Sequence, residues 1–241
     1  MKAEKRRRWI VTGASRGIGL AVAKRALAAG DRVALFARSP AVESLAGELG
    51  ENALGVPVDV TDPVDIQQAL EKVTATFGGV DVLVNNAGLH RGGLLETLSD
   101  DDWDAVLNVN LSAPFRLIRA LRPNLSAGSA IVNVGAVVGF RGFAGDSSYG
   151  ASKAGLAGLT RILAIELARH GIRVNLVVPG FVRTAMTAAV DERASERILK
   201  RIPMRREGVE SEIAEVVFWV AGSSYMTGAV VPVDGGLSAN L

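Results

Sequence analysis

The stretch Thr12-Gly13-Ala14-Ser15-Arg16-Gly17-Ile18-Gly19 separates an apolar run at residues 8–12 from a run of helical periodicity at residues 17–29. The first run predicts a β-strand, and the second predicts an amphipathic helix that ends at Gly30. Glycines let the backbone turn tightly and approach a pyrophosphate, which binds at the N-terminus of such a helix. The spacing is GxxxGxG rather than the GxGxxG of the usual dinucleotide-binding fingerprint. This strand–loop–helix context favours phosphate binding over a plain tight turn.

Apolar runs and helix-periodic runs alternate along the rest of the chain. Further strands are predicted at residues 32–37, 53–58, 80–84, 130–134, 172–178 and 229–233. Further helices are predicted at residues 41–49, 64–77, 99–121, 149–167 and 210–221. Strands that alternate regularly with helices form a parallel sheet with helices on both faces. We therefore predict an α/β fold, a Rossmann-type doubly wound parallel sheet, as one domain over residues 1–241, with its ligand-binding residues just after the strands.

The bulk composition narrows the class of protein. The chain has 241 residues, of which 49% are hydrophobic and 22% charged, and this suits one globular domain with a substantial core. The net charge of +2 is too small for a nucleic-acid groove, and we interpret the basic cluster Lys5-Arg6-Arg7-Arg8 as the solvated entry to a strand. No apolar run reaches the length of a membrane span, and the N-terminus lacks a signal-peptide hydrophobic region. We therefore expect no membrane partner and a cytoplasmic location.

The sequence also argues against a metal site. It contains no cysteine and only two histidines, His90 and His170, without a paired-carboxylate pattern beside them. Because His170 follows a predicted helix, we interpret it as a structural cation near the C-terminal end of the helix dipole. His90 follows the turn Asn85-Asn86-Ala87-Gly88 near the expected cleft, and a substrate-facing role for it stays open.

The residue after the second predicted strand indicates which dinucleotide would bind. An NAD site needs an acidic residue there to accept a hydrogen bond from the ribose 2′-hydroxyl. The chain instead has Phe36-Ala37-Arg38-Ser39, without an acid, and Arg16 in the glycine loop supplies a second cation. Two arginines beside a ribose fit a 2′-phosphate, so we predict NADP(H) as the cofactor. Taken alone, Arg38 is also compatible with a solvated charge at a strand end.

Polar residues follow other predicted strands and interrupt a helix. Asp59 can accept a hydrogen bond from an adenine amino group, or it can cap the helix that starts near Pro63. The residues Asn85-Asn86-Ala87-Gly88 can shape a cofactor floor, although this motif alone also suits a turn. Asparagine is a poor helix former, so Asn110 marks a kink or a bound water in the long predicted helix. Three aromatic residues at core-like spacings are interpreted as packing: Trp103, Phe115 and Trp219.

The run Tyr149-Gly150-Ala151-Ser152-Lys153 opens another helix-periodic segment. Positions four apart lie on one face of a helix, so the Tyr149 hydroxyl and the Lys153 ammonium can point into one site. A phenol titrates near pH ~10, and a fixed cation that lowers its pKa by about three units must supply roughly 4 kcal/mol. The two side chains can act as a general acid–base pair, whereas the same spacing on a solvated helix face would carry no function.

Together these motifs resemble those of the classical short-chain dehydrogenases/reductases. The motifs agree in order and spacing over essentially the whole chain: TGxxxGIG at 12–19, NNAG at 85–88, Asn110 in Val109-Asn110-Leu111, YxxxK at 149–153, Pro179-Gly180 before Thr184, Thr227-Gly228 and Asp234-Gly235-Gly236. Within the family, the run Pro179-Gly180-Phe181-Val182 with Thr184, Met186 and Thr187 looks most like the 3-oxoacyl-[acyl-carrier-protein] reductase branch.

The resemblance implies an NADP-dependent oxidoreductase that reduces a small carbonyl compound, free or bound to a carrier or CoA, to an alcohol. It implies hydride transfer from the nicotinamide C4 with Tyr149 as proton donor. Lys153 would bind the nicotinamide ribose and lower the pKa of Tyr149, and Asn110 would hold a water that links Lys153 to solvent. The implied cofactor-binding residues are Gly13, Ser15, Arg16, Gly17, Ile18, Gly19, Arg38, Asp59, Val60, Asn86, Ala87, Gly88, Tyr149, Lys153, Pro179, Gly180, Val182 and Thr184.

One position departs from the family pattern. The family places a catalytic serine on a strand end about thirteen residues before the tyrosine, and Ala136 stands there in this chain. By analogy with the loss of one oxyanion-hole donor, the cost would be about 10²–10³ in rate, or roughly 2.7–4 kcal/mol. Ser147 and Ser148 enter the tyrosine helix and should not replace the missing hydroxyl.

Two origins of Ala136 fit the sequence: an engineered Ser→Ala version of an active reductase, or a natural variant that has lost or rerouted its chemistry. We favour the engineered version, because Tyr149, Lys153 and Asn110 are all retained. The alternative function is that of an NADP(H)-binding regulator or scaffold without catalysis. Dehydratase or epimerase chemistry on the same fold is less favoured.

The substrate and the assembly are indicated only through the resemblance. Carrier-protein reductases dock an acidic carrier with basic residues, whereas residues 124–128 of this chain contain no cation and the end of the tyrosine helix offers Arg169, His170 and Arg173. A small free ketone therefore fits as well as a carrier-bound one. The family also implies a homotetramer, which would cover apolar residues that we expect beyond one buried face of each long helix: Phe115, Leu117, Leu156, Leu159 and Leu163.

Overall fold

The computed structural model describes residues 6–185, 187 and 192–239. These residues build a seven-stranded sheet with the order β3-β2-β1-β4-β5-β6-β7, and each strand is parallel to its neighbours. The strands are β1 (Arg8–Thr12), β2 (Arg32–Ala37), β3 (Ala53–Pro57), β4 (Val82–Asn85), β5 (Ala130–Val134), β6 (Arg173–Pro179) and β7 (Val230–Val233). The predicted doubly wound parallel sheet is thereby confirmed.

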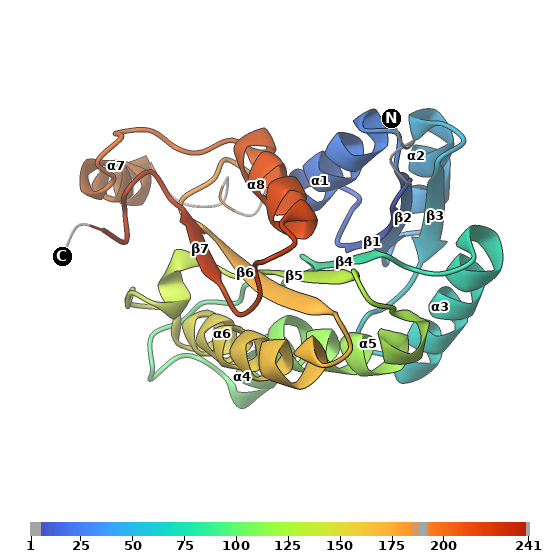
Figure 1. The fold of residues 1–241 in the computed structure, drawn as a ribbon. Coiled ribbons are helices and arrows are strands. Elements are labelled where there is room, and N and C mark those ends of the chain that lie inside the picture. The colour runs from blue at the N-terminus through green and yellow to red at the C-terminus, as the bar shows by residue number, and fades with distance from the viewer. Residues whose placement is uncertain (1–5, 186, 188–191, 240–241) are drawn as a thin grey trace.

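Helices cover both faces of the sheet (Figure 1). One face carries α1 (Gly17–Ala28), α2 (Ala41–Leu49) and α8 (Glu210–Gly222). The other carries α3 (Pro63–Phe77), α4 (Asp100–Leu107), α5 (Ala113–Leu121) and α6 (Ser147–Ala168). The helix α7 (Glu192–Arg201) lies apart from both layers, near the C-terminus.

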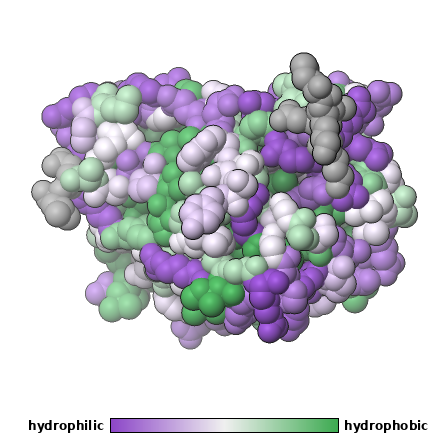
Figure 2. All heavy atoms as spheres, viewed as in Figure 1, coloured by the Kyte–Doolittle hydropathy of each residue, from purple (hydrophilic) through white to green (hydrophobic). Residues whose placement is uncertain are grey.

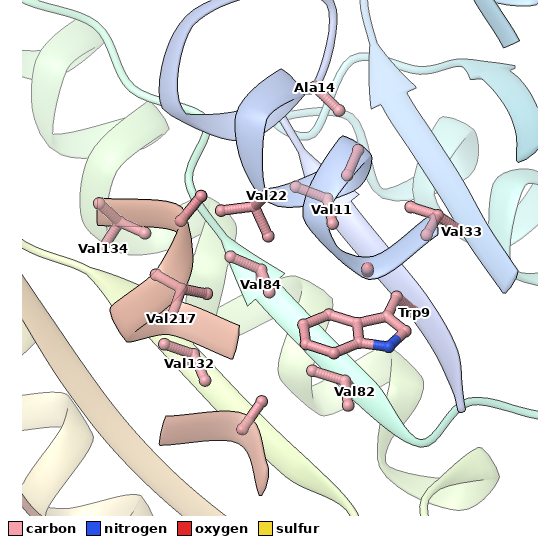
Figure 3. Packing of buried hydrophobic residues seen from close by; sticks show 14 of the residues in the cluster. Trp9, Val11, Ala14, Val22, Val33, Val82, Val84, Val132, Val134 and Val217 are labelled. Atoms are coloured by element: carbon pink, nitrogen blue, oxygen red, sulfur yellow. The ribbon is translucent and has the colours of Figure 1, made fainter. Parts of the chain in front are cut away.

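Side chains of the central strands alternate between two buried cores, as the period of two of a β-strand requires. Trp9 and Val11 of β1 face the core beneath α1, α2 and α8, whereas Ile10 faces the core on the opposite side of the sheet. In Figure 3, Trp9 packs with valines of three other strands and with Val217 of α8. The Trp9 ring also stacks on the Phe218 ring, with 5.6 Å between the centroids. The first strand and the last helix are therefore packed directly together.

The interpretation of the basic cluster at the N-terminus as a solvated strand entry was wrong for Arg7 and Arg8, whereas Arg6 is exposed. Arg7 forms an ion pair with Asp31 at 3.1 Å, and Arg8 forms one with Asp81 at 2.7 Å. Because Asp31 and Asp81 precede β2 and β4, the two strands next to β1, each acid lies beside an arginine at the same edge of the sheet. Lys5 lies outside the described residues.

The predicted helix at 99–121 is divided into three parts. A π-helical turn, Asn108–Ser112, joins α4 to α5, and Asn110, at which a kink or a bound water was predicted, lies within it. The side chain that caps α3 belongs to Asp62, which accepts hydrogen bonds from the N–H groups of Val64 and Asp65. The alternative role of Asp59 as the helix cap was therefore wrong. The sequence interpretation also missed α7, whose only large apolar residues are Ile198 and Leu199.

Several predictions of packing were wrong, because helical spacing shows that a residue shares a face but not what covers that face. The side chains of Trp103, Phe115 and Trp219 are exposed. Conversely, three leucines that we expected on a second face belong to the core: Leu117, Leu156 and Leu163.

His170 is not the expected cation, although it does lie at the end of α6. Desolvation and the charges of Arg122 and Arg169 lower the pKa of His170 from its ordinary value. At neutral pH the imidazole is therefore mostly uncharged, because desolvation first and the neighbouring guanidinium groups second disfavour its protonation.

The outer surface mixes polar and apolar residues. On the face shown in Figure 2, hydrophilic residues surround separate hydrophobic patches rather than forming one continuous field. Within the described residues, no helix has the length and apolar character needed to cross a membrane.

Candidate active site

A cavity of about 510 Å³ gathers most of the predicted site residues at the carboxyl edge of the sheet. Its size lies in the usual range for small-molecule and cofactor sites. Eighteen of the predicted residues line it: Gly13, Ser15, Arg16, Gly17, Ile18, Arg38, Asp59, Val60, Asn86, Ala87, Gly88, Ala136, Tyr149, Lys153, Pro179, Gly180, Val182 and Thr184. Gly19 and Asn110 are buried behind its wall.

The glycine loop after β1 needs its glycines for two different reasons. Gly13 and Gly17 have φ values of +65° and +64°, in the left-handed region that favours glycine. Gly19 instead allows close packing, because a Cβ there would lie 2.4 Å from the carbonyl oxygen of Gly13. Among the described residues no side chain caps α1, whose N-cap is Arg16. The helix therefore presents uncapped N–H groups at its N-terminus, where an anion is favoured.

Side-chain hydrogen bonds hold the glycine loop against the end of β4. The Thr12 hydroxyl accepts hydrogen bonds from the backbone N–H groups of Asn86 and Ala87, both at 2.9 Å. The Asn86 amide donates to the carbonyl oxygens of Thr12 and Gly13, at 2.9 and 3.3 Å. Asn86 thus shapes the cavity through the loop, and any direct contact of Asn86 with a cofactor stays a prediction.

The cavity wall near β2 and β3 carries positive charge. Arg16 and Arg38 are exposed, and neither forms an ion pair within the described residues. The hydroxyl and N–H groups of Thr61 bind Asp59 and lower the pKa of its carboxyl, to which Arg38 also contributes. This donor set fits a dinucleotide with a 2′-phosphate, because the arginines are unpaired and Asp59 is an ionised acceptor.

Tyr149 and Lys153 lie on the first two turns of α6. Lys153 is only 3% exposed, and its Nζ donates to the carbonyl oxygen of Val134 at 2.9 Å. The same Nζ lies 5.6 Å from the centroid of the Tyr149 ring. The two side chains therefore share one site, as their spacing predicted.

The predicted lowering of the Tyr149 pKa was wrong for the protein without its cofactor. Burial, with a contribution from the Asp146 carboxylate, raises the pKa of Tyr149 to about 12. Burial lowers the pKa of Lys153 to about 8. Desolvation disfavours both charged forms, and one ammonium that is itself desolvated does not outweigh it. At neutral pH Tyr149 is therefore a phenol with a proton to donate.

Asn110 connects three parts of the site. Its amide nitrogen donates to the Leu89 carbonyl oxygen at 2.9 Å and to the Ser152 hydroxyl at 3.0 Å, and its oxygen accepts from the Leu89 N–H at 2.8 Å. The Ser152 hydroxyl in turn donates to the Tyr149 carbonyl oxygen at 2.7 Å. The π-helical turn thereby holds both the segment after β4 and the start of α6. The water that Asn110 would hold stays a prediction.

Ala136 lines the same cavity as Tyr149, at the end of β5. Its backbone is extended, with φ −160° and ψ 152°, a conformation that any residue adopts. Neither serine at the start of α6 replaces the hydroxyl that alanine lacks. Ser148 is buried and donates to the carbonyl oxygen of Arg91 at 3.0 Å, and Ser147 is exposed.

Other residues near the cavity were not predicted. Arg91, Asn108 and Val109 line it, although only their sequence neighbours had been selected. Their proximity to Gly88 and Asn110 is the signal that could have found them. Thr184 and Thr187 hydrogen-bond to each other and both line the cavity, whereas Met186 lies outside the described residues.

The basic residues considered for carrier docking have different surroundings. Arg169 and His170 are exposed at the end of α6. The Arg173 guanidinium instead donates to the carbonyl oxygens of Val220, Ala221 and Ser223 at the end of α8. It therefore completes the C-terminus of that helix rather than offering a free charge. Within the described chain, no cluster of His, Asp or Glu side chains is arranged to hold a metal ion.

Comparisons with known proteins agree with this architecture. A family model described as "Enoyl-(Acyl carrier protein) reductase" matches residues 13–238. The 3-oxoacyl-[acyl-carrier-protein] reductase FabG of Salmonella typhimurium is 42% identical over 233 residues, which cover 95% of this chain and 96% of the relative.

Two solved structures have the same fold. A blue fluorescent protein from a metagenomic library, in complex with NADPH, superposes with a TM-score of 0.91 and is 37% identical in sequence. The alignment covers 96% of this chain and 98% of the fluorescent protein chain. A mutant of a short-chain dehydrogenase/reductase of Serratia marcescens superposes with a TM-score of 0.91 and is 35% identical in sequence. The alignment covers 96% of this chain and 98% of the Serratia chain. From the family model, the relative and these structures, the chain belongs to the short-chain dehydrogenase/reductase family.

Proposed function

We propose that this protein catalyses the NADPH-dependent reduction of a ketone, a 3-oxoacyl or related carbonyl compound, to the corresponding alcohol. The observation that carries the proposal is the placement of a protonated Tyr149 and a buried Lys153 in one cavity with the glycine loop. The similarity to a 3-oxoacyl-[acyl-carrier-protein] reductase supports the substrate class. The similarity to a structure in complex with NADPH supports the cofactor.

NADP(H) would be held by the residues that line the cavity. The uncapped start of α1 would bind the pyrophosphate, with Gly13 and Gly17 allowing the close approach. Arg16 and Arg38 would bind the 2′-phosphate, and Asp59 would accept a hydrogen bond from the adenine amino group. Val60, Pro179 and the other lining residues would form the remaining walls. Lys153 would hold the nicotinamide ribose.

When bound, the reduced nicotinamide would supply a hydride to the carbonyl carbon. Tyr149 donates its phenolic proton to the carbonyl oxygen, so that the carbonyl becomes an alcohol and the tyrosine becomes a phenolate. The Lys153 ammonium stabilises that phenolate electrostatically, which matters most inside a desolvated site. A proton from solvent then restores the phenol, by way of the water predicted at Asn110.

Ala136 would make this reaction slow rather than absent. A serine at this strand end would donate a hydrogen bond to the carbonyl oxygen, and an alanine cannot. The loss of one such donor costs about 10²–10³ in rate. The engagement of Arg173 with α8 removes one of the basic residues considered for carrier docking, so a free carbonyl substrate fits as well as a carrier-bound one.

The test is the oxidation of NADPH, followed by its absorbance, with a panel of ketones and 3-oxoacyl thioesters. The panel is run on this chain and on its Ala136→Ser variant. We expect slow turnover of at least one carbonyl compound by the chain and faster turnover by the variant. Should the variant bind NADPH yet reduce nothing across the panel, the reductase proposal fails, and a non-catalytic NADP(H)-binding protein takes its place.

A further inference from the structure

A histidine beside Tyr149 has no role in the reaction described above. The His90 ring lies edge-on to the Tyr149 ring, with 5.1 Å between the centroids and 80° between the planes. His90 Nε2 is 2.7 Å from Asp146 Oδ1. Since an ionised carboxylate only accepts hydrogen bonds, Nε2 must carry a proton and donate it. The other ring nitrogen, Nδ1, has no hydrogen-bond partner within the described residues.

Asp146 holds His90 instead of its own helix. Asp146 is the N-cap residue of α6, where an aspartate side chain usually accepts a hydrogen bond from an N–H of the first turn. Among the described residues, its carboxylate makes no such bond and is directed to His90. The local sequence thus gives up a helix cap, worth about 1 kcal/mol in typical cases, to orient an imidazole.

The His90–Asp146 pair is not needed to attach the segment after β4 to α6. That segment is already held by a backbone hydrogen bond from Gly93 to Gly145 at 2.9 Å and by the Ser148 hydroxyl on the Arg91 carbonyl oxygen. The backbone also makes room for the ring, because a Cβ on Gly92 would lie 3.2 Å from His90 Cε1. A side chain that is fixed in place but not required for attachment suggests contact with a ligand.

We propose that His90 is a specificity-determining residue, which donates a hydrogen bond from Nδ1 to the second carbonyl of a 3-oxoacyl substrate; this rests on the proposed ketone reduction. The ketone oxygen would accept from Tyr149, and the second carbonyl carbon lies two bonds away, at roughly 2.5 Å from the ketone carbon. Because the His90 ring lies against the Tyr149 ring, we expect Nδ1 to reach the second oxygen. A carbonyl oxygen accepts only, so the bond requires the protonated imidazole.

The charges around His90 favour that protonated form. The hydrogen bond to Asp146 raises the pKa of His90 above its ordinary value, despite partial burial. Tyr149 is neutral at neutral pH, and the adjacent Arg91 is paired with Asp102 at 2.8 Å. Below its raised pKa, Nδ1 donates; as the pH rises through that pKa, Nδ1 becomes an acceptor and the preference for the second carbonyl is lost.

The test compares kcat/KM for ethyl 3-oxobutanoate with that for 2-heptanone, a chain of the same length without the second carbonyl. Measurements are made in the Ala136→Ser background, so that turnover is readily measured, at several pH values. We expect His90→Phe, which keeps a ring against Tyr149, to lower the ratio of the two values about tenfold at low pH. Asp146→Asn should move the loss of preference to lower pH. His170→Phe, at the exposed end of α6, is the matched control and should leave the ratio unchanged.

The remaining outcomes of this kinetic comparison would overturn the proposed role of His90 or lead to a binding measurement that tests it. An equal fall for both substrates in His90→Phe would show that His90 only positions Tyr149, and no change would show that it has no role. If no variant turns over either compound, the proposed function fails. In that case, calorimetric titration of the two compounds into the NADPH-loaded protein decides about His90. Weaker binding of the oxo-ester alone in His90→Phe would support the proposal, and equal binding would overturn it.

Discussion

Ala136 is the residue with the most direct consequence for rate. The extended backbone at this position accepts a serine without strain, and the side chain would face the cavity shared with Tyr149. We expect Ala136→Ser to raise kcat by about 10²–10³ with little change in KM, because the new hydrogen bond strengthens as charge develops on the carbonyl oxygen. Steady-state kinetics with NADPH measures both constants. In the restored background, Tyr149→Phe should remove most of the gain, and a retained gain would exclude Tyr149 as the proton donor.

Arg38 should decide which dinucleotide binds. The guanidinium is exposed and unpaired in the described structure, beside an Asp59 whose carboxyl stays ionised. We expect tighter binding of NADPH than of NADH, and Arg38→Asp should reduce or reverse this preference by replacing a phosphate-binding cation with an acceptor for the 2′-hydroxyl. Fluorescence titration gives the two dissociation constants. Lys24→Asp, on the exposed side of α1, is the control with the same change of charge and should leave the preference unchanged. Equal dissociation constants for the two cofactors in the unaltered chain would contradict the assignment.

Lys153 should lower stability while it serves the reaction. Its pKa falls from 10.5 to about 8 in the folded protein, so the folded state binds protons less readily than the unfolded state. Burial of the Lys153 ammonium therefore lowers the free energy of unfolding. This loss is complete below pH 8 and disappears as the pH rises to 10.5. At pH 7 we expect Lys153→Met to raise the free energy of unfolding by about 1–2 kcal/mol, after allowance for the lost bond to Val134, and to abolish most turnover.

Thermal unfolding at two pH values measures this effect. At pH 7 the Tm of Lys153→Met should lie about 2–6 °C above that of the unaltered chain. Near pH 10.5 the difference should be smaller, because the buried lysine is then largely neutral. A lower Tm for Lys153→Met at pH 7 would mean that its hydrogen bond stabilises more than its burial costs.

At the level of single residues, the sequence predicted which side chains meet but not their environment. Motif spacing brought Tyr149, Lys153 and Arg38 to one cavity, because residues that follow parallel strands must share one edge. The spacing could not give the pKa of Tyr149, which depends on how much water the fold removes. It also could not show the contact of His90 with Tyr149, because these residues come from separate segments and share no motif.

The π-helical turn is the element on which the site depends most. Asn110→Ala would leave the Leu89 backbone and the Ser152 hydroxyl without three hydrogen bonds in a buried place. We expect a loss of about 2–4 kcal/mol in the free energy of unfolding, measured by urea denaturation, together with a fall in kcat. Asn124→Ala, at an exposed position, should change it by less than about 0.5 kcal/mol. A stability loss as small as that of the control would show that the turn forms without this side chain.

Elements differed in how well the sequence predicted them. The strands emerged within a residue or two, because buried parallel strands are continuous apolar runs. The segment 99–121 keeps helical periodicity throughout, so only the poor helix former Asn110 hinted at the π-helical turn within it. The helix α7 was missed because its residues are mostly charged, and its apolar side chains pack beside Ile202, which directly follows the helix, and beside Val137 of a distant segment.

For the whole molecule, we expect a homotetramer. Although Leu117, Leu156 and Leu163 are buried in the core, other apolar side chains of α5 and α6 remain uncovered: Phe115 at 42%, Ile162 at 55% and Ile165 at 76% exposed. A second copy on these helices would remove them from water. Analytical ultracentrifugation should show a tetramer at micromolar concentration, and Ile162→Glu with Ile165→Glu should give a smaller species. Val64→Glu, at a similarly exposed position on α3, is the control and should leave the tetramer intact. A monomer in the unaltered chain would refute the assembly.

The stacking of Trp9 on Phe218 has a consequence for how the chain matures during synthesis. β1 lies inside the sheet between β2 and β4, yet one of the helices that cover its Trp9 face, α8, comes about 200 residues later in the chain. While the ribosome still holds Phe218, the Trp9 face of the sheet lacks the part of its cover that α8 supplies, although β1 to β6, α1 and α2 all precede α8 in the chain. The nascent protein therefore exposes part of this apolar surface until α8 has emerged, which is the interval in which a chaperone would be needed.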